Sequence, residues 1–196
     1  MTFAANAKSY RQNYNYGYDS ETSKRVGLIQ LGYGHGVSGS GQVIGNYEAN
    51  RFNFSSVLGY KFSPYFVGGF GVGMNYYNTP YCKDLTMPVF LYLHSNFSQG
   101  NTSPFISLGG GFNRFLANFD NIQIDKGGYF GGLTVEPTFG LSFKISQKFR
   151  LSLSLSYTLD QVQYLKQLYL ASYLISSEKV TGYAGALTFK IGILNF

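Results

Sequence analysis

The stretch "GLSFKISQKFRLSLSLSY", residues 140–157, decides the fold of this chain. In it, Leu, Phe and Ile alternate with Ser, Lys and Arg over two runs, and residues 146–148 separate the runs. Alternation with a period of two is the pattern of a β-strand that has one apolar and one polar face. The open question is whether the apolar face covers a protein core or faces lipid.

Similar runs recur from residue 25 to the end of the chain. We expect eight strands, at residues 25–37, 51–62, 64–77, 87–97, 104–114, 133–145, 149–158 and 182–196. The short connections "FSP", "SQGNTSP" and "SQK" alternate with longer ones at residues 38–51, 77–86, 115–130 and 159–181. Short turns at one end and long loops at the other are typical of an up-and-down barrel in an outer membrane.

Three properties of these runs favour lipid. Several runs alternate for about ten residues, enough for a tilted strand to cross a bilayer, whereas strands of soluble proteins usually have about five or six. The polar face consists mainly of Ser, Thr and Gly, which suits a narrow interior. The apolar face carries Tyr60, Tyr76 and Tyr157 near its ends, where an aromatic girdle lies. We therefore predict an all-β fold, an eight-stranded antiparallel up-and-down transmembrane β-barrel over residues 25–196.

Composition excludes several function classes. Charged residues make up 12% of the chain, about half the ~25% of soluble domains. The formal charge is +6, but the basic residues are scattered, so we expect no nucleic-acid partner. Cys82 is the only cysteine, and His35 and His94 lack the spacing of a zinc motif. No run of 18 apolar residues is present, so we expect no transmembrane helix. We also expect no metal and no cofactor.

The N-terminal residues 1–24 form a separate polar segment. Within it, Ala5-Asn6-Ala7 fits the small-x-small pattern of a signal cleavage site. One interpretation makes residues 1–7 the remnant of an export signal, and the other makes the triplet a chance match. The Tyr-rich remainder is expected to be a periplasmic segment.

Three stretches carry a resemblance to a known family: "GYKFSPYFVGGFGVGMNYY" (59–77), "SPFISLGGGFNR" (103–114) and "PTFGLSFKISQKFRLSLSLSY" (137–157). They resemble the outer membrane protein β-barrel domain family of Gram-negative bacteria, over about residues 25–196. The resemblance implies a location in the outer membrane, contact with membrane lipid and lipopolysaccharide, and recognition of Phe196 by the barrel assembly machinery. It implies no catalytic residue.

Three features conflict with a regular barrel or leave it open. Pro137 lies in mid-strand and cannot donate a ladder hydrogen bond, so we expect a bulge there. Ile191 and Ile193 are out of phase with Leu194 and Phe196, which predicts a bulge or a change of face. The connection 159–181 is rich in Leu and Tyr, and it is either a short amphipathic helix or an extension of both strands beyond the membrane.

Glu136 is the most informative charge, because it lies in mid-strand on the expected interior face. An eight-stranded barrel has an interior just wide enough for side chains, and a buried carboxylate must be paired. We expect a structural ion-pair network that fills the lumen; the alternative is a catalytic or proton-handling carboxylate. The other charged residues expected in the interior are Lys61, Lys144, Arg150 and Lys190.

Two motifs suggest chemistry that we do not expect. "LHSNF" (93–97) is similar to a stretch of lipid A deacylases, which are eight-stranded barrels, and Glu136 could orient its histidine. However, His94 and Ser95 are adjacent, so they point to opposite faces of a strand and lack the geometry of a nucleophile and its base. "GYGHGVSGSG" (32–41) and "GGFGVG" (68–73) resemble phosphate loops, but no helix follows either of them.

We therefore expect a small outer-membrane barrel with a packed lumen and no enzyme activity. Its role is structural, or is surface recognition through extracellular loops. One alternative is a lipid-modifying outer-membrane enzyme. Another is a soluble lipocalin-like barrel with the apolar face inside, against which the low charge and the terminal Phe196 argue.

Overall fold

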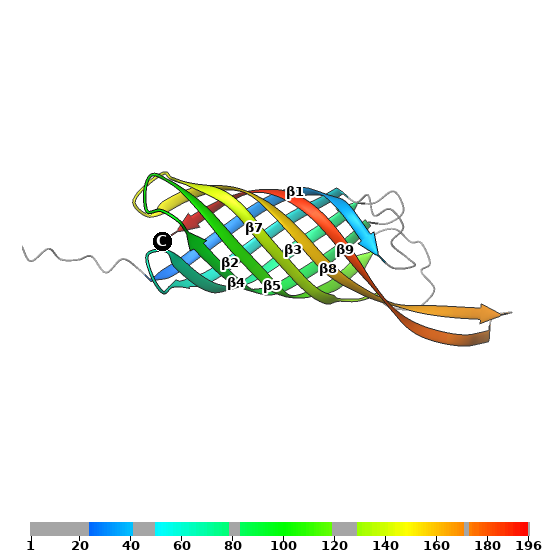
Figure 1. The fold of residues 1–196 in the computed structure, drawn as a ribbon. Coiled ribbons are helices and arrows are strands. Elements are labelled where there is room, and N and C mark those ends of the chain that lie inside the picture. Colours follow the sequence, from blue (N-terminus) through cyan, green and yellow to red (C-terminus); the bar gives the residue numbers. More distant parts are fainter. Residues whose placement is uncertain (1–23, 41–49, 79–82, 119–128, 171–172, 196) are drawn as a thin grey trace, which may run out of the picture.

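Antiparallel strands wind around one axis into a closed barrel (Figure 1). The computed structural model describes residues 24–40, 50–78, 83–118, 129–170 and 173–195. The long strands are β1 (Arg25–Ser40), β2 (Asn50–Lys61), β3 (Phe66–Asn78), β4 (Lys83–Asn96), β5 (Thr102–Asn118), β7 (Gly132–Lys144), β8 (Phe149–Leu170) and β9 (Tyr173–Asn195). A two-residue strand, β6 (Tyr129–Phe130), precedes β7 and also pairs with β8.

The sheet closes because β9 pairs with both β8 and β1. Closure leaves no strand edge along the barrel wall, which removes a template for aggregation. The predicted fold class, an eight-stranded antiparallel barrel, is confirmed. Among the described residues, no helix is long and apolar enough to span a bilayer.

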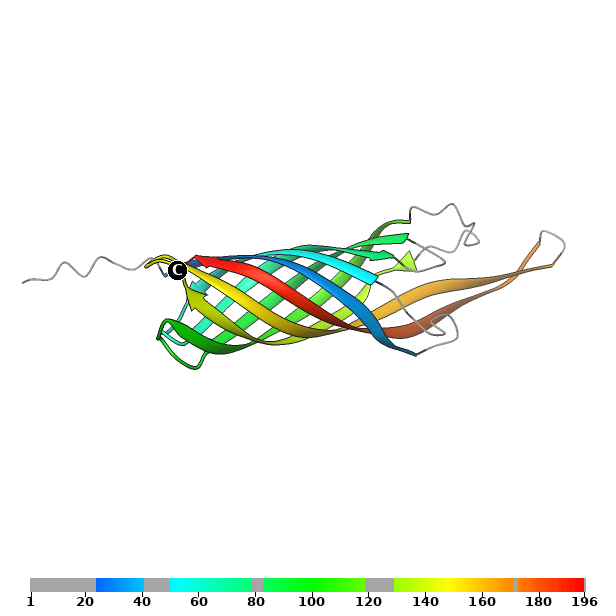
Figure 2. The same ribbon diagram turned by 90° about the horizontal axis from the view of Figure 1, so that it is seen from above.

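The region 159–181 extends two strands and forms no helix in its described residues. β8 and β9 pair from Phe149 opposite Asn195 as far as Leu170 opposite Tyr173, with one irregularity at Leu168. Both views show this hairpin projecting well beyond the rim of the barrel (Figures 1 and 2). Of the two interpretations of this connection, the strand extension is therefore the one found.

The two faces of the strands answer the question posed by residues 140–157. Apolar side chains point outward: Leu58 is 76% exposed, Phe139 62% and Ile29 54%. Hydroxyl side chains point inward and are buried, including Ser103, Ser142, Ser152, Ser156, Thr158 and Thr188. The apolar face therefore covers no core. The lipocalin-like alternative, which needs that face inside, is wrong.

Aromatic side chains gather on the outer surface of the barrel beside the β2–β3 turn. The ring centres of Tyr60 and Phe62 are 5.3 Å apart, and those of Phe62 and Phe66 are 5.9 Å apart. All three side chains are exposed. They lie where the aromatic girdle of a membrane barrel lies, at the edge of the apolar belt.

The bulge expected at Pro137 is absent. Pro137 pairs with Leu108 of β5 in an unbroken register. Toward β8, the pairs Val135–Leu159 and Thr138–Ser156 keep one register, and between them only Glu136 and Pro137 have no partner in β8. Proline lacks an N–H group, so the ladder loses local pairing without an inserted residue.

The irregularity expected near the end of β9 is also absent. The pairs Ile29–Ile193 and Leu28–Leu194 continue the register between β1 and β9. Leu194 therefore points inward and packs with Leu28, Val57 and Tyr92 in a buried apolar cluster. The prediction was wrong because it assumed that the interior is polar along its whole length.

The short β2–β3, β4–β5 and β7–β8 turns lie together at one end of the barrel, which we call the turn end. Ser63 and Ser146 stabilise two of these turns, since their hydroxyl oxygens accept backbone N–H groups two or three residues later. Residues 1–23, Cys82 and Phe196 lie outside the described residues. The division at residue 24, the Ala5-Asn6-Ala7 export signal and the role of Phe196 in assembly stay predictions.

Candidate functional site

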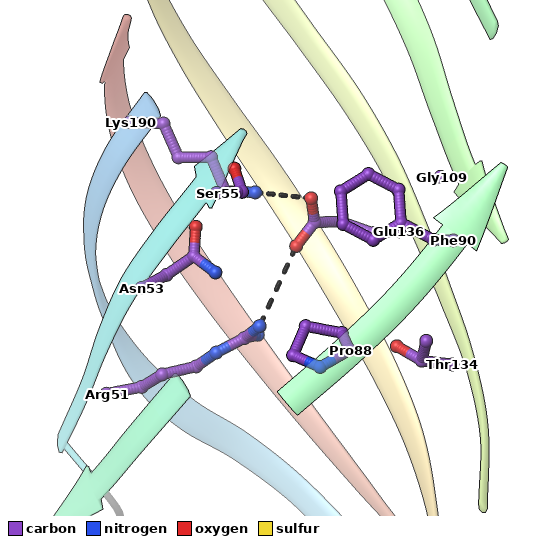
Figure 3. Close-up of a pocket in the computed structure, with 9 residues that line it drawn as sticks. All are labelled: Arg51, Asn53, Ser55, Pro88, Phe90, Gly109, Thr134, Glu136 and Lys190. Atoms are coloured by element: carbon purple, nitrogen blue, oxygen red, sulfur yellow. Dashed lines mark hydrogen bonds and ion pairs between the residues drawn. The ribbon is translucent and has the colours of Figure 1, made fainter. Parts of the chain in front are cut away.

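The middle of the lumen holds an ion-pair network centred on Glu136 of β7 (Figure 3). The Lys190 ammonium of β9 donates a hydrogen bond to Glu136 Oε1. Thr158 Oγ1 of β8 donates to Glu136 Oε2 at 2.8 Å. Arg51 Nη2 of β2 lies 3.8 Å from the same Oε2. One carboxylate thus joins two cations and a hydroxyl from three other strands.

Arg51 and Glu136 connect opposite walls of the barrel. Along the sheet, β3, β4 and β5 separate β2 from β7 on one side, and β8, β9 and β1 separate them on the other. A contact between these strands therefore passes through the lumen. The pair fixes the distance between two walls that share no backbone hydrogen bond.

Polar groups extend the network along the lumen. Arg51 Nη2 donates to Asn75 Oδ1 at 2.9 Å, and Asn53 Nδ2 donates to the same oxygen at 2.6 Å. The Arg51 guanidinium also lies 5.5 Å from the ring centre of Tyr77. The Tyr77 hydroxyl donates to Asp160 Oδ2 at 2.6 Å. A second carboxylate is thereby tied to the same layer of side chains.

Burial makes this pairing necessary. The exposed fractions of the Arg51 and Lys190 residues are 2% and 1%. Moving an ion from water into a protein interior costs several kcal/mol even after relaxation. Among the described residues, the Glu136 carboxylate and the hydrogen bonds around it help to offset that cost for two cations so close together. Glu136, Arg51, Lys190 and Thr158 therefore form one buried network that links strands across the lumen, and we call this network the cross-brace.

Phe90 completes the filling beside the network. Phe90 and Pro88 of β4 lie next to Glu136 (Figure 3). A Cβ atom at Gly71 would overlap the Phe90 ring, so glycine leaves the space in which the ring packs against β3. The "GGFGVG" segment is accordingly part of strand β3. The cavity left beside the network has about 20 Å³, room for one water molecule.

The sequence identified part of this network. It placed Glu136 and Lys190 inside, and they are in contact. It also placed Lys61, Lys144 and Arg150 inside, but they lie at the turn end, away from Glu136. Arg51 was missed, although it alternates with the buried Asn53 and Ser55 in "RFNFS". That alternation was a usable signal for an inward arginine.

His94 and Ser95 lie on opposite faces of β4, as predicted. His94 is 2% exposed, and its Nδ1 lies 3.2 Å from the Tyr92 hydroxyl. Its ring centre lies 4.7 Å from that of Phe105. Ser95 pairs with Phe66 and Ile106, two outward-facing residues. His94 is thus packed as a buried aromatic side chain and does not face the adjacent serine.

The other histidine lies far from this position. His35 Nδ1 is 3.2 Å from Asn50 Oδ1, on the exposed side of β1. Within the described ranges, no three side chains of His, Cys, Asp or Glu gather closely enough to hold a metal ion.

Solved structures share this architecture. The outer membrane protein OprG of Pseudomonas aeruginosa matches with a TM-score of 0.61 at 9% identity, covering 89% of this chain and 96% of that one. AlkL in lipid bilayers matches with a TM-score of 0.53 at 15% identity, covering 99% and 96%. Neisserial surface protein A matches with a TM-score of 0.51 at 12% identity, covering 86% and 97%. A scan of family models and a search of curated sequences give no match.

These findings define the class of protein. The chain has the fold of a small eight-stranded outer-membrane β-barrel. An apolar outer belt surrounds a polar, buried interior, which is the arrangement a bilayer requires. Fold and belt together place the chain in the outer membrane of a Gram-negative bacterium, as predicted, and outer-membrane barrels generally lie among membrane lipid and lipopolysaccharide.

Proposed function

We propose that this protein is a non-enzymatic outer-membrane barrel that recognises a partner at the cell surface through its loop end. The observation that carries the proposal is the β8–β9 ribbon, defined as residues 165–170 and 173–182. In membrane barrels the short turns are periplasmic and the long loops extracellular. This rule directs the ribbon away from the cell.

The ribbon has two free edges in the described part of the chain. On one side, pairing of β8 with β6 reaches Tyr164 and goes no further. On the other side, pairing of β9 with β1 reaches Tyr183. Between these limits β8 and β9 pair with each other alone. Unpaired N–H and C=O groups along a strand edge can bind an extended peptide by adding it to the sheet.

The stability of the ribbon supports the same role. A two-stranded hairpin with no third strand is marginally stable in water. A bound strand would add a third member, so the ribbon should gain order when a partner binds. The partner class that fits this edge is an extended peptide segment of another protein.

The lumen supports recognition over transport. Glu136, Arg51, Lys190 and Phe90 fill its middle and leave about 20 Å³. An eight-stranded barrel is only wide enough for its own side chains. The proposed activity therefore lies outside the lumen.

The same geometry supports the absence of enzyme activity. His94 faces the interior and Ser95 faces outward, so the pair cannot act as base and nucleophile on one substrate. Lipopolysaccharide deacylation by the purified protein, lost in His94→Ala, would contradict this part of the proposal.

A shortened ribbon tests the recognition role. Leu165 and Lys179 are direct cross-strand partners, so an Asn-Gly turn can replace residues 166–178 without a change of register. The probe is a random peptide display library panned on both purified proteins in detergent. We expect peptides that bind the native barrel and lose binding to the shortened one. Peptides that bind both equally, or no enrichment, would contradict the proposal.

A further inference from the structure

A second cavity lies at the turn end and has no part in the ion-pair network. It measures about 170 Å³, and all three short turns contribute to its lining. Its cationic side chains are Lys61 at the end of β2, Lys144 at the end of β7 and Arg150 at the start of β8. Ten residues of β2, about 33 Å of strand, separate Lys61 from Arg51 of the lumen network.

The charged residues that line this cavity in the described part of the chain are of one sign. They are three cations, with no carboxylate among them. The acidic residues of the described ranges are Asp84, Glu136, Asp160 and Glu178, and none of them lies at this end. Like charges that converge on a concave mouth with a low-dielectric wall focus a positive potential there. An anion is the ligand that this potential attracts.

Arg150 is held in place by neutral partners. Its Nε donates to Ser142 Oγ at 3.2 Å, and its Nη2 donates to the backbone oxygen of Gly100 at 2.9 Å. Gly100 belongs to the β4–β5 turn and Ser142 to β7, so the guanidinium is fixed between that turn and that strand. In the described part of the chain, neither Arg150 nor Lys144 pairs with a carboxylate. A fixed guanidinium with no anionic partner is suited to a phosphate oxygen.

The turn hydroxyls add donors to the same lining. Ser98 Oγ accepts the Gly100 N–H at 3.1 Å, and Ser146 Oγ accepts the Lys148 and Phe149 N–H groups at 3.3 and 3.2 Å. Because each oxygen already accepts a backbone hydrogen bond, each hydroxyl proton remains to be donated. Cations and hydroxyl donors together match a group that has several acceptor oxygens and a negative charge.

The geometry points to a binding site for a phosphate group, in which Lys144 and Arg150 hold the oxygens at the turn-end mouth and Lys61 lines the cavity beside them. The volume, about 170 Å³, is many times the roughly 10–15 Å³ that a cavity needs to hold one water molecule. It therefore has room for one tetrahedral oxyanion and a few waters. The ligand class is inorganic phosphate or a phosphomonoester, free or carried by a lipid headgroup.

Inorganic phosphate is the first probe. The purified barrel in non-ionic detergent is titrated with phosphate against sodium chloride of equal ionic strength, and binding is followed by calorimetry. We expect saturable binding that Lys144→Gln weakens at least tenfold. Lys148→Gln is the matched control, because Lys148 lies on the same turn outside the cavity lining; it should bind phosphate as the native barrel does.

Arg150→Gln should weaken binding further, but Arg150 also ties the β4–β5 turn to β7. Its folding is checked by the heat-dependent gel shift, and Lys144→Gln keeps the test valid if Arg150→Gln misfolds. Equal losses in Lys144→Gln and Lys148→Gln would reduce the effect to general charge and overturn the proposal. Failure of phosphate to bind more strongly than chloride would overturn it as well.

Lipid nanodiscs distinguish the two sources of the phosphate group. The titration is repeated in phosphatidylcholine discs with and without phosphatidic acid, whose headgroup is a phosphomonoester. If a lipid headgroup occupies the site, phosphatidic acid lowers the apparent affinity for inorganic phosphate in the native barrel and in Lys148→Gln. If the ligand is free phosphate, the affinity stays the same. Either result supports a phosphate site.

Discussion

Replacing Glu136 by leucine removes the carboxylate that contacts both Arg51 and Lys190. Both cations are almost fully buried, at 2% and 1% exposed. At 3.8 Å, the attraction between Glu136 and Arg51 alone is about 4 kcal/mol at an effective dielectric constant of about 20. Breaking a buried pair by removing one partner costs about 3–5 kcal/mol, because the remaining charge is uncompensated. We expect Glu136→Leu to lower the free energy of unfolding by that amount.

Urea unfolding of the barrel in detergent measures the change. It is followed by far-ultraviolet circular dichroism, because the chain contains no tryptophan for fluorescence. Glu136→Gln is the graded control, since its amide oxygen still accepts from Lys190 or Thr158 but lacks the charge; its loss should be smaller. A triple variant with Glu136, Arg51 and Lys190 all changed to leucine should recover much of the stability, because apolar replacement of a whole buried ion group is often neutral. An unfolding midpoint of Glu136→Leu equal to that of the native barrel would refute the cross-brace.

Three other predictions follow from packing, hydrogen bonding and the filled lumen. Gly111→Ala should destabilise the barrel by about 1–3 kcal/mol, because the added Cβ would overlap the Val89 carbonyl oxygen. Gly110→Ala is the control, since a Cβ there meets nothing within 4 Å and should be tolerated. Equal melting temperatures of the two variants would contradict this packing. Tyr77→Phe should cost about 1.5–3 kcal/mol through loss of the 2.6 Å hydrogen bond to the buried Asp160, and denaturant unfolding without any loss would contradict that contact. Planar bilayers with the native protein should show no large steady conductance, and a large steady current would contradict the filled lumen.

Local alternation was enough to predict the strands in the barrel wall. Residues 140–145 and 149–157 carry the period of two on either side of a short turn, and their serines are buried whereas Leu141 and Leu155 are exposed. The pattern failed where a contact distant in sequence decides the outcome. β8 continues to Leu170 because β9 pairs with it there. The Leu- and Tyr-rich composition of residues 159–170 fitted a short helix as well as this extension, so the sequence left both open.

The interior showed the same limit. Alternation predicts that Glu136 points inward, but its partner Arg51 comes from the opposite wall, and only closure of the barrel brings the two strands together. Leu194 points inward into a buried apolar cluster near the turn end. A pattern that assigns one face of every strand as polar along its whole length does not predict this cluster. Lys144 and Arg150 are cross-strand neighbours at one short turn, but turns distant in sequence supply the rest of their cavity, and local alternation does not show this.

The most direct test of the central claim, that the apolar face is turned toward lipid, is gel mobility of the detergent-extracted protein with and without boiling. A closed membrane barrel resists the detergent until it is heated. We therefore expect a different mobility in the unboiled sample and recovery of the protein in the outer-membrane fraction. A single mobility in both samples, with the protein soluble in the absence of detergent, would contradict the account.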